Sequence, residues 1–155
     1  MSARIFVRVQ KDTFDVFVEA AKLTEGRGDI GALVTFTGLC RDEGGALAAL
    51  EIEHYPGMAE AEITRVALEA ASRWPLEGII AIHRHGLIKP GEPIVLAVTA
   101  SQHRAEAFAA ACFLMDYLKT EAPFWKKRHL AAGKEPGDWV EAKAQDQAAA
   151  QKWRA

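Results

Sequence analysis

Cysteine is scarce in this chain, and long hydrophobic runs are missing. Of the 155 residues only Cys40 and Cys112 are cysteines, and their separation matches neither a zinc motif nor a redox motif. No apolar run approaches the roughly 20 residues that a membrane-spanning helix needs, and the N-terminus lacks the apolar core of a signal peptide. We therefore expect a protein of the reducing cytoplasm that folds without disulfide bonds.

A large excess of charge of one sign is also lacking. The formal net charge is -2 and the isoelectric point is about 6.2, so no overall field favours nucleic acid or an anionic membrane. Half of the residues are hydrophobic, which suits a single domain over residues 1–155 with a substantial core. No repeat, low-complexity tract or linker divides the chain.

Common catalytic motifs are absent as well. The sequence contains no Gly-x-Ser-x-Gly elbow and no Gly-x-x-x-x-Gly-Lys phosphate loop. His83 and His85 face the same side of an expected strand, and His54 could join them at a metal. No carboxylate or cysteine accompanies them at a recognisable spacing, so we expect core or surface histidines and no metal. Arg41 could lower the pKa of Cys40, but one thiol with one neighbour is a weak signal.

Hydrophobic periodicity predicts a mixture of strands and helices. Because they do not alternate strictly, we expect an α+β fold with a mostly antiparallel sheet. The first helix is expected to be capped at Asp12 or Thr13, and the last two strands are expected to form a hairpin around residues 133–137. The predicted strands cover residues 4–9, 32–37, 47–54, 78–85, 93–99, 124–130 and 139–142, a turn covers 86–93, and helices cover 14–21, 58–74 and 144–153.

Residues 101–128 carry the strongest functional signal. Ser101 is the expected N-cap of a further helix, which ends before Pro123. Cys112 is expected to be a small core residue on that helix. The apolar stripe of this helix is predicted to contain Ala107, Phe108, Ala111, Leu114, Met115 and Leu118.

Cations cluster at both ends of this helix. His103 and Arg104 open it against the helix dipole, whereas Lys119 closes it where a cation is favoured. Aromatic and apolar residues lie between these cations, which suits a pocket for an anion attached to a flat ring. A solvated basic face is the plainer alternative. Three further cations follow in the next predicted strand: Lys126, Lys127 and Arg128.

Lysines are the best candidates for chemistry in this cluster. A lysine can transfer a proton near neutral pH when burial or a neighbouring cation lowers its pKa. Lys119 and Lys126 lie near other cations and beside apolar residues, so we take them as the catalytic candidates. Fixed charges that hold an anion and stabilise its developing charge are the other role open to them.

Long motifs place the chain beside a known family. EHYPGM and DYLKTEAPFWK are the most specific, and all the matching segments follow the family's order over almost the whole chain. On these motifs the chain resembles the large, catalytic subunit of molybdopterin synthase. The segments are VTFTGLCR (34–41), LEIEHYPGMAE (50–60), RWPL (73–76), IHRHG (82–86), PGE (90–92), SQHRAEAF (101–108), MDYLKTEAPFWKK (115–127) and WVEA (139–142).

The resemblance implies a sulfur transferase with an α/β hammerhead-like fold and a small added β subdomain. A small ubiquitin-like partner would carry sulfur as a thiocarboxylate on its C-terminal Gly-Gly tail. The catalytic subunit would transfer it twice onto cyclic pyranopterin monophosphate, giving the dithiolene of molybdopterin. The family's assembly is a homodimer core with a partner at each end, a heterotetramer, and it implies no resident cofactor or metal.

The resemblance also assigns roles to individual residues. Lys119 and Lys126 fall on the family's essential lysines, and we assign Lys119 to the reacting sulfur and acyl end and Lys126 to substrate orientation and proton transfer. Its substrate pocket falls on Arg41, His103 and Arg104, and the adjoining basic strand continues with Lys127 and Arg128.

Two positions depart from the family's pattern. Lys143 stands where we expect an Arg that reaches the phosphate from the second subunit, and a lysine keeps the charge but loses the bidentate fork. We include Lys143 among the substrate-binding candidates. Cys40 stands where many members have an aliphatic residue.

Helix length adds a constraint on the site. Arg104 and Lys119 are 15 positions apart, which is about 22 Å along a continuous helix. One pterin cannot touch both, so we expect a pocket shared across a two-fold dimer. Lys119, Lys126 and Arg41 would come from one subunit, and His103 and Arg104 from its mate.

Two other functions stay open at this point. The chain could be a non-catalytic docking module for a ubiquitin-like protein, in which the lysines would be dispensable. It could also be a different enzyme acting on a pterin or nucleotide phosphate without a protein partner.

Overall fold

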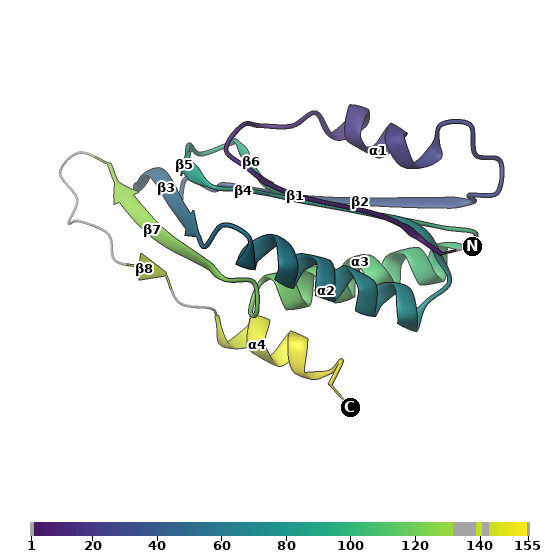
Figure 1. Ribbon diagram of the computed structural model, residues 1–155. Helices are drawn as coiled ribbons and strands as arrows, with labels where there is room; N and C mark the ends of the chain where they lie inside the picture. The colour runs from purple at the N-terminus through teal and green to yellow at the C-terminus, as the bar shows by residue number, and fades with distance from the viewer. Residues whose placement is uncertain (1, 132–138, 141–142, 155) are drawn as a thin grey trace.

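A four-stranded sheet forms the centre of the protein (Figure 1). The computed structural model describes residues 2–131, 139–140 and 143–154. The strand order is β1 (Arg4–Gln10), β4 (Leu76–Arg84), β6 (Pro93–Ser101) and β2 (Ala32–Leu39). β1 and β4 are parallel, and the other neighbours are antiparallel. Helix α1 (Val16–Thr24) covers one face, and α2 (Met58–Arg73) and α3 (Arg104–Leu118) cover the other.

A second, smaller sheet lies at one end of the first (Figure 1). It is antiparallel, in the order β5 (Gly86–Ile88), β3 (Leu47–His54), β7 (Phe124–Leu130) and β8 (Trp139–Val140), and helix α4 (Ala144–Gln151) follows it. The predicted α+β class, with a mostly antiparallel sheet and a small added β subdomain, is confirmed. Within the described part of the chain, no helix is both long enough and apolar enough to cross a membrane.

The two central strands explain why the fold holds together. β4 and β6 are buried on both faces, so they read as nearly continuous apolar runs. Phe113 and Leu114 of α3 pack on Ile79 from one side, while Leu23 of α1 packs near Ile80 from the other. Small residues let α3 approach the sheet closely: Ala107, Ala110 and Ala111 are all buried.

The start of α3 differs from the prediction. His103 is the N-cap residue, whereas the predicted cap, Ser101, is the last residue of β6. Ser101 pairs with Ala32 in β2, and its hydroxyl donates to the Pro75 carbonyl over 2.9 Å. Ser101, which the capping pattern assigned to the helix, therefore forms part of the sheet.

The start of α1 is also later than predicted. Asp15 is the cap, and its carboxylate accepts the N–H groups of Phe17 and Val18. The predicted caps, Asp12 and Thr13, instead lie in the preceding turn, where their carbonyls accept the Gln10 amide.

Two residues predicted to be buried on α3 are exposed. Phe108 is 61% exposed, and Cys112 is exposed as well. The helix turns Phe113 and Tyr117 into the core instead, because the buried face is centred about one position away from the predicted stripe.

Segment boundaries account for the remaining differences. The predicted turn over residues 86–93 contains strand β5, and α4 ends at Gln151 instead of residue 153. β7 and β8 pair as predicted. The predicted hairpin loop at residues 133–137 and the end of the last strand at 141–142 lie outside the described residues.

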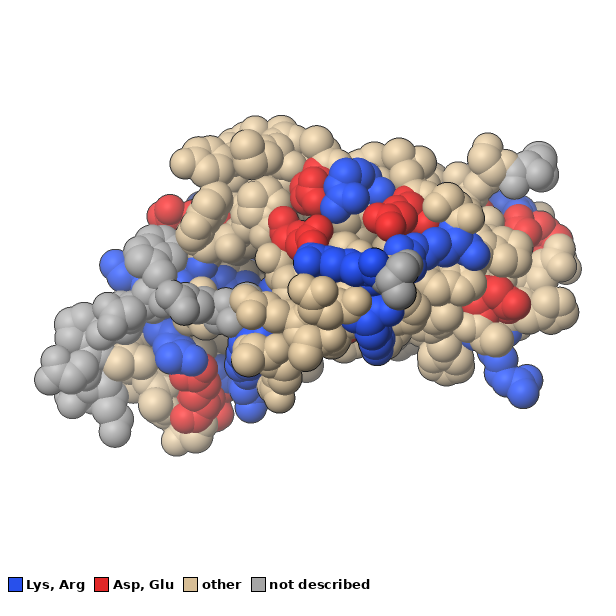
Figure 2. All heavy atoms as spheres, turned by 90° about the horizontal axis from the view of Figure 1, so that it is seen from below, with Lys and Arg blue, Asp and Glu red and all other residues tan. Residues whose placement is uncertain are grey.

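Surface charge on the helical side is mixed in sign. Figure 2 shows this side with Lys and Arg lying beside Asp and Glu. Ion pairs along α2 account for part of it, with Arg65 2.6 Å from Glu62 and Arg73 3.0 Å from Glu69. This agrees with a chain that does not rely on a single-sign field for binding.

Gly31 gives a direct test of how α3 is positioned. Its N–H donates to the Ser101 carbonyl over 3.0 Å, and a Cβ at Gly31 would overlap the carbonyl oxygen of Gln102. We predict that Gly31→Ala lowers the free energy of unfolding by about 1–3 kcal/mol, because two backbone segments must separate. Gly28→Ala is the control, since no atom lies within 4 Å of its Cβ position. Urea unfolding measures both, and equal stabilities would contradict this packing.

Candidate active site

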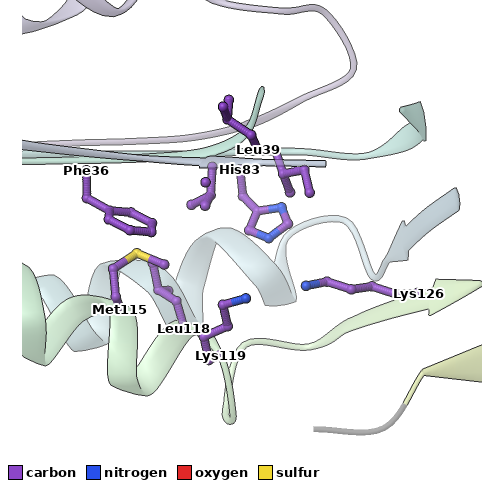
Figure 3. Close-up of a pocket in the computed structure, with 10 residues that line it drawn as sticks. Phe36, Leu39, His83, Met115, Leu118, Lys119 and Lys126 are labelled. Atoms are coloured by element: carbon purple, nitrogen blue, oxygen red, sulfur yellow. The ribbon is translucent and has the colours of Figure 1, made fainter. Parts of the chain in front are cut away.

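Two lysines from different elements face one small cavity. Lys119 is the C-cap residue of α3, and Lys126 is in β7. Figure 3 shows their amino groups extending toward the same space. The cavity has a volume of about 60 Å³ and is lined by Phe36, Gly38, Leu39, His83, Ile94, Val95, Met115, Leu118, Lys119 and Lys126. The structure thus brings together the two residues that the sequence singled out for catalysis.

Helix termination positions Lys119. Its N–H donates to the Met115 carbonyl over 3.0 Å, and the N–H of Glu121 donates to the Tyr117 carbonyl over 2.8 Å. Pro123 then prevents further helical turns, and β7 begins at the next residue. The amine of Lys119 therefore lies where the carbonyl end of the helix dipole favours a cation.

Sheet pairing positions Lys126. The residue lies between Ile52 of β3 and Val140 of β8, so neighbouring strands flank it on both sides. The residue as a whole retains some exposure, while its amine end is closely surrounded by protein. Burial, and then the nearby charge of Lys119, lower the pKa of Lys126 to about 8. A sizeable fraction of this lysine can therefore lose its proton near neutral pH.

A second pocket adjoins the lysine pair. It has a volume of about 250 Å³, and Lys143 and Asp146 from the start of α4 line it together with Lys119 and Lys126. Lys143 thus lies beside the two lysines of its own chain, whereas the resemblance led us to expect it to reach the phosphate from a second subunit. The three cations make this pocket suitable for an anion.

His103 and Arg104 lie at the opposite end of α3 from Lys119. Both are exposed, and the His103 side chain forms no capping hydrogen bond. The 15 residues of α3 span about 22 Å. One chain does not bring these two residues to the lysine pair.

The remaining predicted binding residues surround the small sheet. Arg41 is exposed and lines a separate pocket of about 480 Å³. Arg128 forms an ion pair with Glu43 over 3.2 Å. Lys127 points away from the face of Lys126, because side chains alternate along a strand, and it lies opposite Glu51. None of these three side chains lines the lysine cavity.

The structure also bears on the histidines and on Cys40, which the sequence analysis considered as metal ligands and as a reactive thiol. His54 and His85 lie 4.4 Å apart between ring centroids. Among the described residues, no group of His, Cys, Asp and Glu has the geometry of a metal site. The suggestion that Arg41 lowers the pKa of Cys40 is wrong, since Cys40 is buried and burial raises its pKa.

The sequence reasoning did not place His83 or Asp146 beside the lysines. In the sequence analysis, His83 was considered only as a possible metal ligand, although side-chain alternation along its strand could have indicated that it faces the interior. Asp146 shares a pocket with Lys126 but follows it by 20 positions in sequence. Only the tertiary packing of α4 beside the small sheet brings Asp146 close to Lys126.

Comparison with known proteins gives the family. A family model described as "MoaE protein" matches residues 9–121. The chain belongs to the MoaE family. The molybdopterin synthase catalytic subunit of Mesorhizobium japonicum is 65% identical over 148 residues, which is 96% of this chain and 92% of that protein.

Solved MoaE-family structures share the fold. The molybdopterin biosynthesis MoaE protein of Burkholderia ambifaria is 42% identical, with a TM-score of 0.81, over 100% of this chain and 99% of that one. Molybdopterin synthase of Staphylococcus aureus is 26% identical, with a TM-score of 0.76, over 85% and 94% of the two chains. The family and enzyme class expected from the motifs are confirmed.

The lysine pair of this MoaE-family chain predicts a measurable coupling. Replacing Lys119 by Met removes a neighbouring positive charge, so the Lys126 ammonium becomes easier to maintain and its pKa should rise above about 8. NMR titration of isotopically labelled lysine measures this directly. Lys127→Met is the matched control, because Lys127 lies on the opposite face of β7. An unchanged or lowered Lys126 pKa in folded Lys119→Met would contradict the proximity of the two amines.

Proposed function

We propose that this chain is the catalytic subunit of a molybdopterin synthase, which transfers sulfur to cyclic pyranopterin monophosphate. The donor is the C-terminal thiocarboxylate of a small ubiquitin-like partner. The single observation that carries the proposal is the convergence of Lys119 and Lys126 on one cavity with apolar and aromatic walls. The curated relative's name, which specifies a catalytic subunit, supports the presence of a further subunit.

The chemistry of this reaction fits the arrangement. Both reactants are anions, and the pterin adds a flat ring, so the site needs cations beside apolar walls. When the thiocarboxylate sulfur attacks a pterin carbon, a C–S bond forms, the C–O bond to the cyclic phosphate breaks, and a charged phosphate monoester forms. Water then cleaves the acyl C–S bond of the resulting thioester, which leaves the sulfur on the pterin and a carboxylate on the partner. Fixed ammonium groups can stabilise that developing charge.

The two lysines have different environments and therefore different roles. Lys119 is exposed at the helix end, where it meets the incoming sulfur and acyl group. Lys126 has a pKa lowered to about 8, so it can give a proton to the leaving oxygen at neutral pH. Lys143, in the adjoining pocket, adds a charge for the phosphate.

The complete pocket is shared between two copies of the chain. His103 and Arg104 are too far along α3 to join Lys119 in one chain, and a two-fold axis can bring the start of one α3 near the end of another. Exposed apolar side chains on edge strand β2 and on α3 support such a pairing, with Phe36 at 41% and Phe108 at 61% exposure. In this proposal Arg41 comes from the same subunit as the lysines, although its side chain lines a separate pocket of that chain.

The first test removes one lysine. We predict that Lys119→Ala reduces dithiolene formation by roughly a hundredfold or more, because an ammonium at the reacting sulfur is lost. The assay combines purified partner thiocarboxylate with cyclic pyranopterin monophosphate. Lys152→Ala is the control, since Lys152 is an exposed lysine at the C-cap of α4 and pairs with Asp116. Near-normal turnover in folded Lys119→Ala would remove this residue from the mechanism, and a docking module would then explain the fold better.

Mixed dimers test the shared pocket. An Arg104→Ala chain and a Lys119→Ala chain should each be inactive alone. After subunit exchange, the two together should recover activity, since one pocket of each heterodimer retains both residues. If exchange is demonstrated and activity stays absent, the pocket is built within a single chain.

A further inference from the structure

His83 is the one imidazole among the residues that line the lysine cavity. It lies near the end of β4 and is 5% exposed. Its ring stacks on Phe124 of β7, with centroids 3.7 Å apart and planes 13° from parallel. The position of His83 in β4 and its stacking on Phe124 together fix the orientation of the imidazole ring.

The ring's hydrogen bond fixes its tautomer. Nδ1 lies 2.8 Å from the Arg84 carbonyl oxygen. A carbonyl only accepts, so Nδ1 carries the proton and Nε2 presents a lone pair. Figure 3 shows the ring extending from the sheet toward the space that Lys119 and Lys126 enter. The cavity therefore contains a fixed acceptor opposite two amines.

Burial keeps this imidazole neutral. It lowers the pKa of His83 to about 3, the Arg84 carbonyl partly opposes the shift, and the charges of Lys126 and Lys119 lower it further. The lone pair at Nε2 is therefore available throughout the neutral range.

The side chains that line the cavity offer few other acceptors. Apart from His83, its lining side chains are hydrocarbon, the Met115 thioether, which accepts only weakly, and the two lysines. Within the described residues, the Lys126 amine forms no hydrogen bond in this structure. A buried ammonium without an acceptor is costly. The flexible Lys126 side chain can turn toward His83 Nε2 in this cavity or toward the Asp146 carboxylate in the adjoining pocket.

We propose that His83 is a positioning residue for Lys126: its Nε2 accepts a hydrogen bond from the Lys126 amine and holds that amine at the cavity. The bond favours the protonated amine, because an ammonium N–H donates a stronger hydrogen bond to Nε2 than the N–H of a neutral amine does. His83 thus opposes the effect of burial and retains the proton that the reaction consumes. The kinetic consequence rests on the proposed sulfur transfer, whereas the hydrogen bond itself does not.

Other groups also set the charge balance around these two residues. The titration of Lys126 depends on these groups as well, because the charge of each can shift the Lys126 pKa. They are Lys119 at the end of α3, Lys143 and Asp146 at the start of α4, Cys40 after β2, and His54 in β3.

A pair of substitutions separates the two ring nitrogens. In His83→Asn, the short amide can still donate to the Arg84 carbonyl but ends before the Nε2 position. In His83→Gln, the longer amide places an oxygen acceptor near that position. Neither change alters the net charge, and both keep a polar group at the site. A difference in the Lys126 pKa between the two variants therefore reports the presence of an acceptor near the Nε2 position. His85→Asn and His85→Gln are controls, because His85 lies outside the lysine cavity.

The test is the pKa of Lys126, measured by NMR on the full chain without substrate or partner. Losing an acceptor for the ammonium should lower this pKa by about one unit in His83→Asn. The value should be largely retained in His83→Gln and unchanged in both His85 variants. Equal Lys126 pKa values in wild type and folded His83→Asn would overturn the proposal, whatever the outcome of any sulfur-transfer assay.

Kinetics then extend the test to the reaction. His83→Asn should lower kcat more than it changes KM, and its activity should be lost at a pH about one unit lower than in wild type. His83→Gln should restore most of the wild-type profile. A uniform loss of activity with an unmoved pH profile would indicate a purely structural role for His83 and contradict the proposal.

Discussion

A buried amine in a small sheet is the constraint on which this site depends. Lys126 is held between β3 and β8, and its amine enters a cavity that also receives Lys119 from the end of α3. Water would normally stabilise such a charge, and its partial removal lowers the Lys126 pKa to about 8. This arrangement costs stability, and we propose that it suits the site to an anion and to proton transfer.

The large sheet and its helices hold that arrangement in place. Apolar strands β4 and β6 provide a rigid base from which His83 and Val95 reach the cavity wall. α3 crosses the sheet and places Lys119 at one end and Arg104 at the other. Its length is the physical reason for proposing a second copy of the chain at each site.

Sequence patterns predicted the fold class and most elements, and they singled out the two lysines that the structure brings to one cavity. Periodicity and β-branched runs were sufficient because the core strands and helices follow them closely. Capping was harder to predict: Ser101 satisfies the pattern of an N-cap, yet its strand pairing with Ala32 prevails. The exposure of Cys112 and the position of Asp146 beside Lys126 depend on tertiary packing, which local patterns do not specify.

The most direct measurement is the second-order rate constant of sulfur transfer as a function of pH, with cyclic pyranopterin monophosphate far below saturation, because this constant reports the pKa values of the protein before the pterin binds. If the protonated Lys126 acts as the proton donor, the rate should fall as pH rises through about 8. The transition should be absent from the residual activity of Lys126→Met. A rate that stays level on both sides of this pH, or a transition that persists in Lys126→Met, would contradict the account.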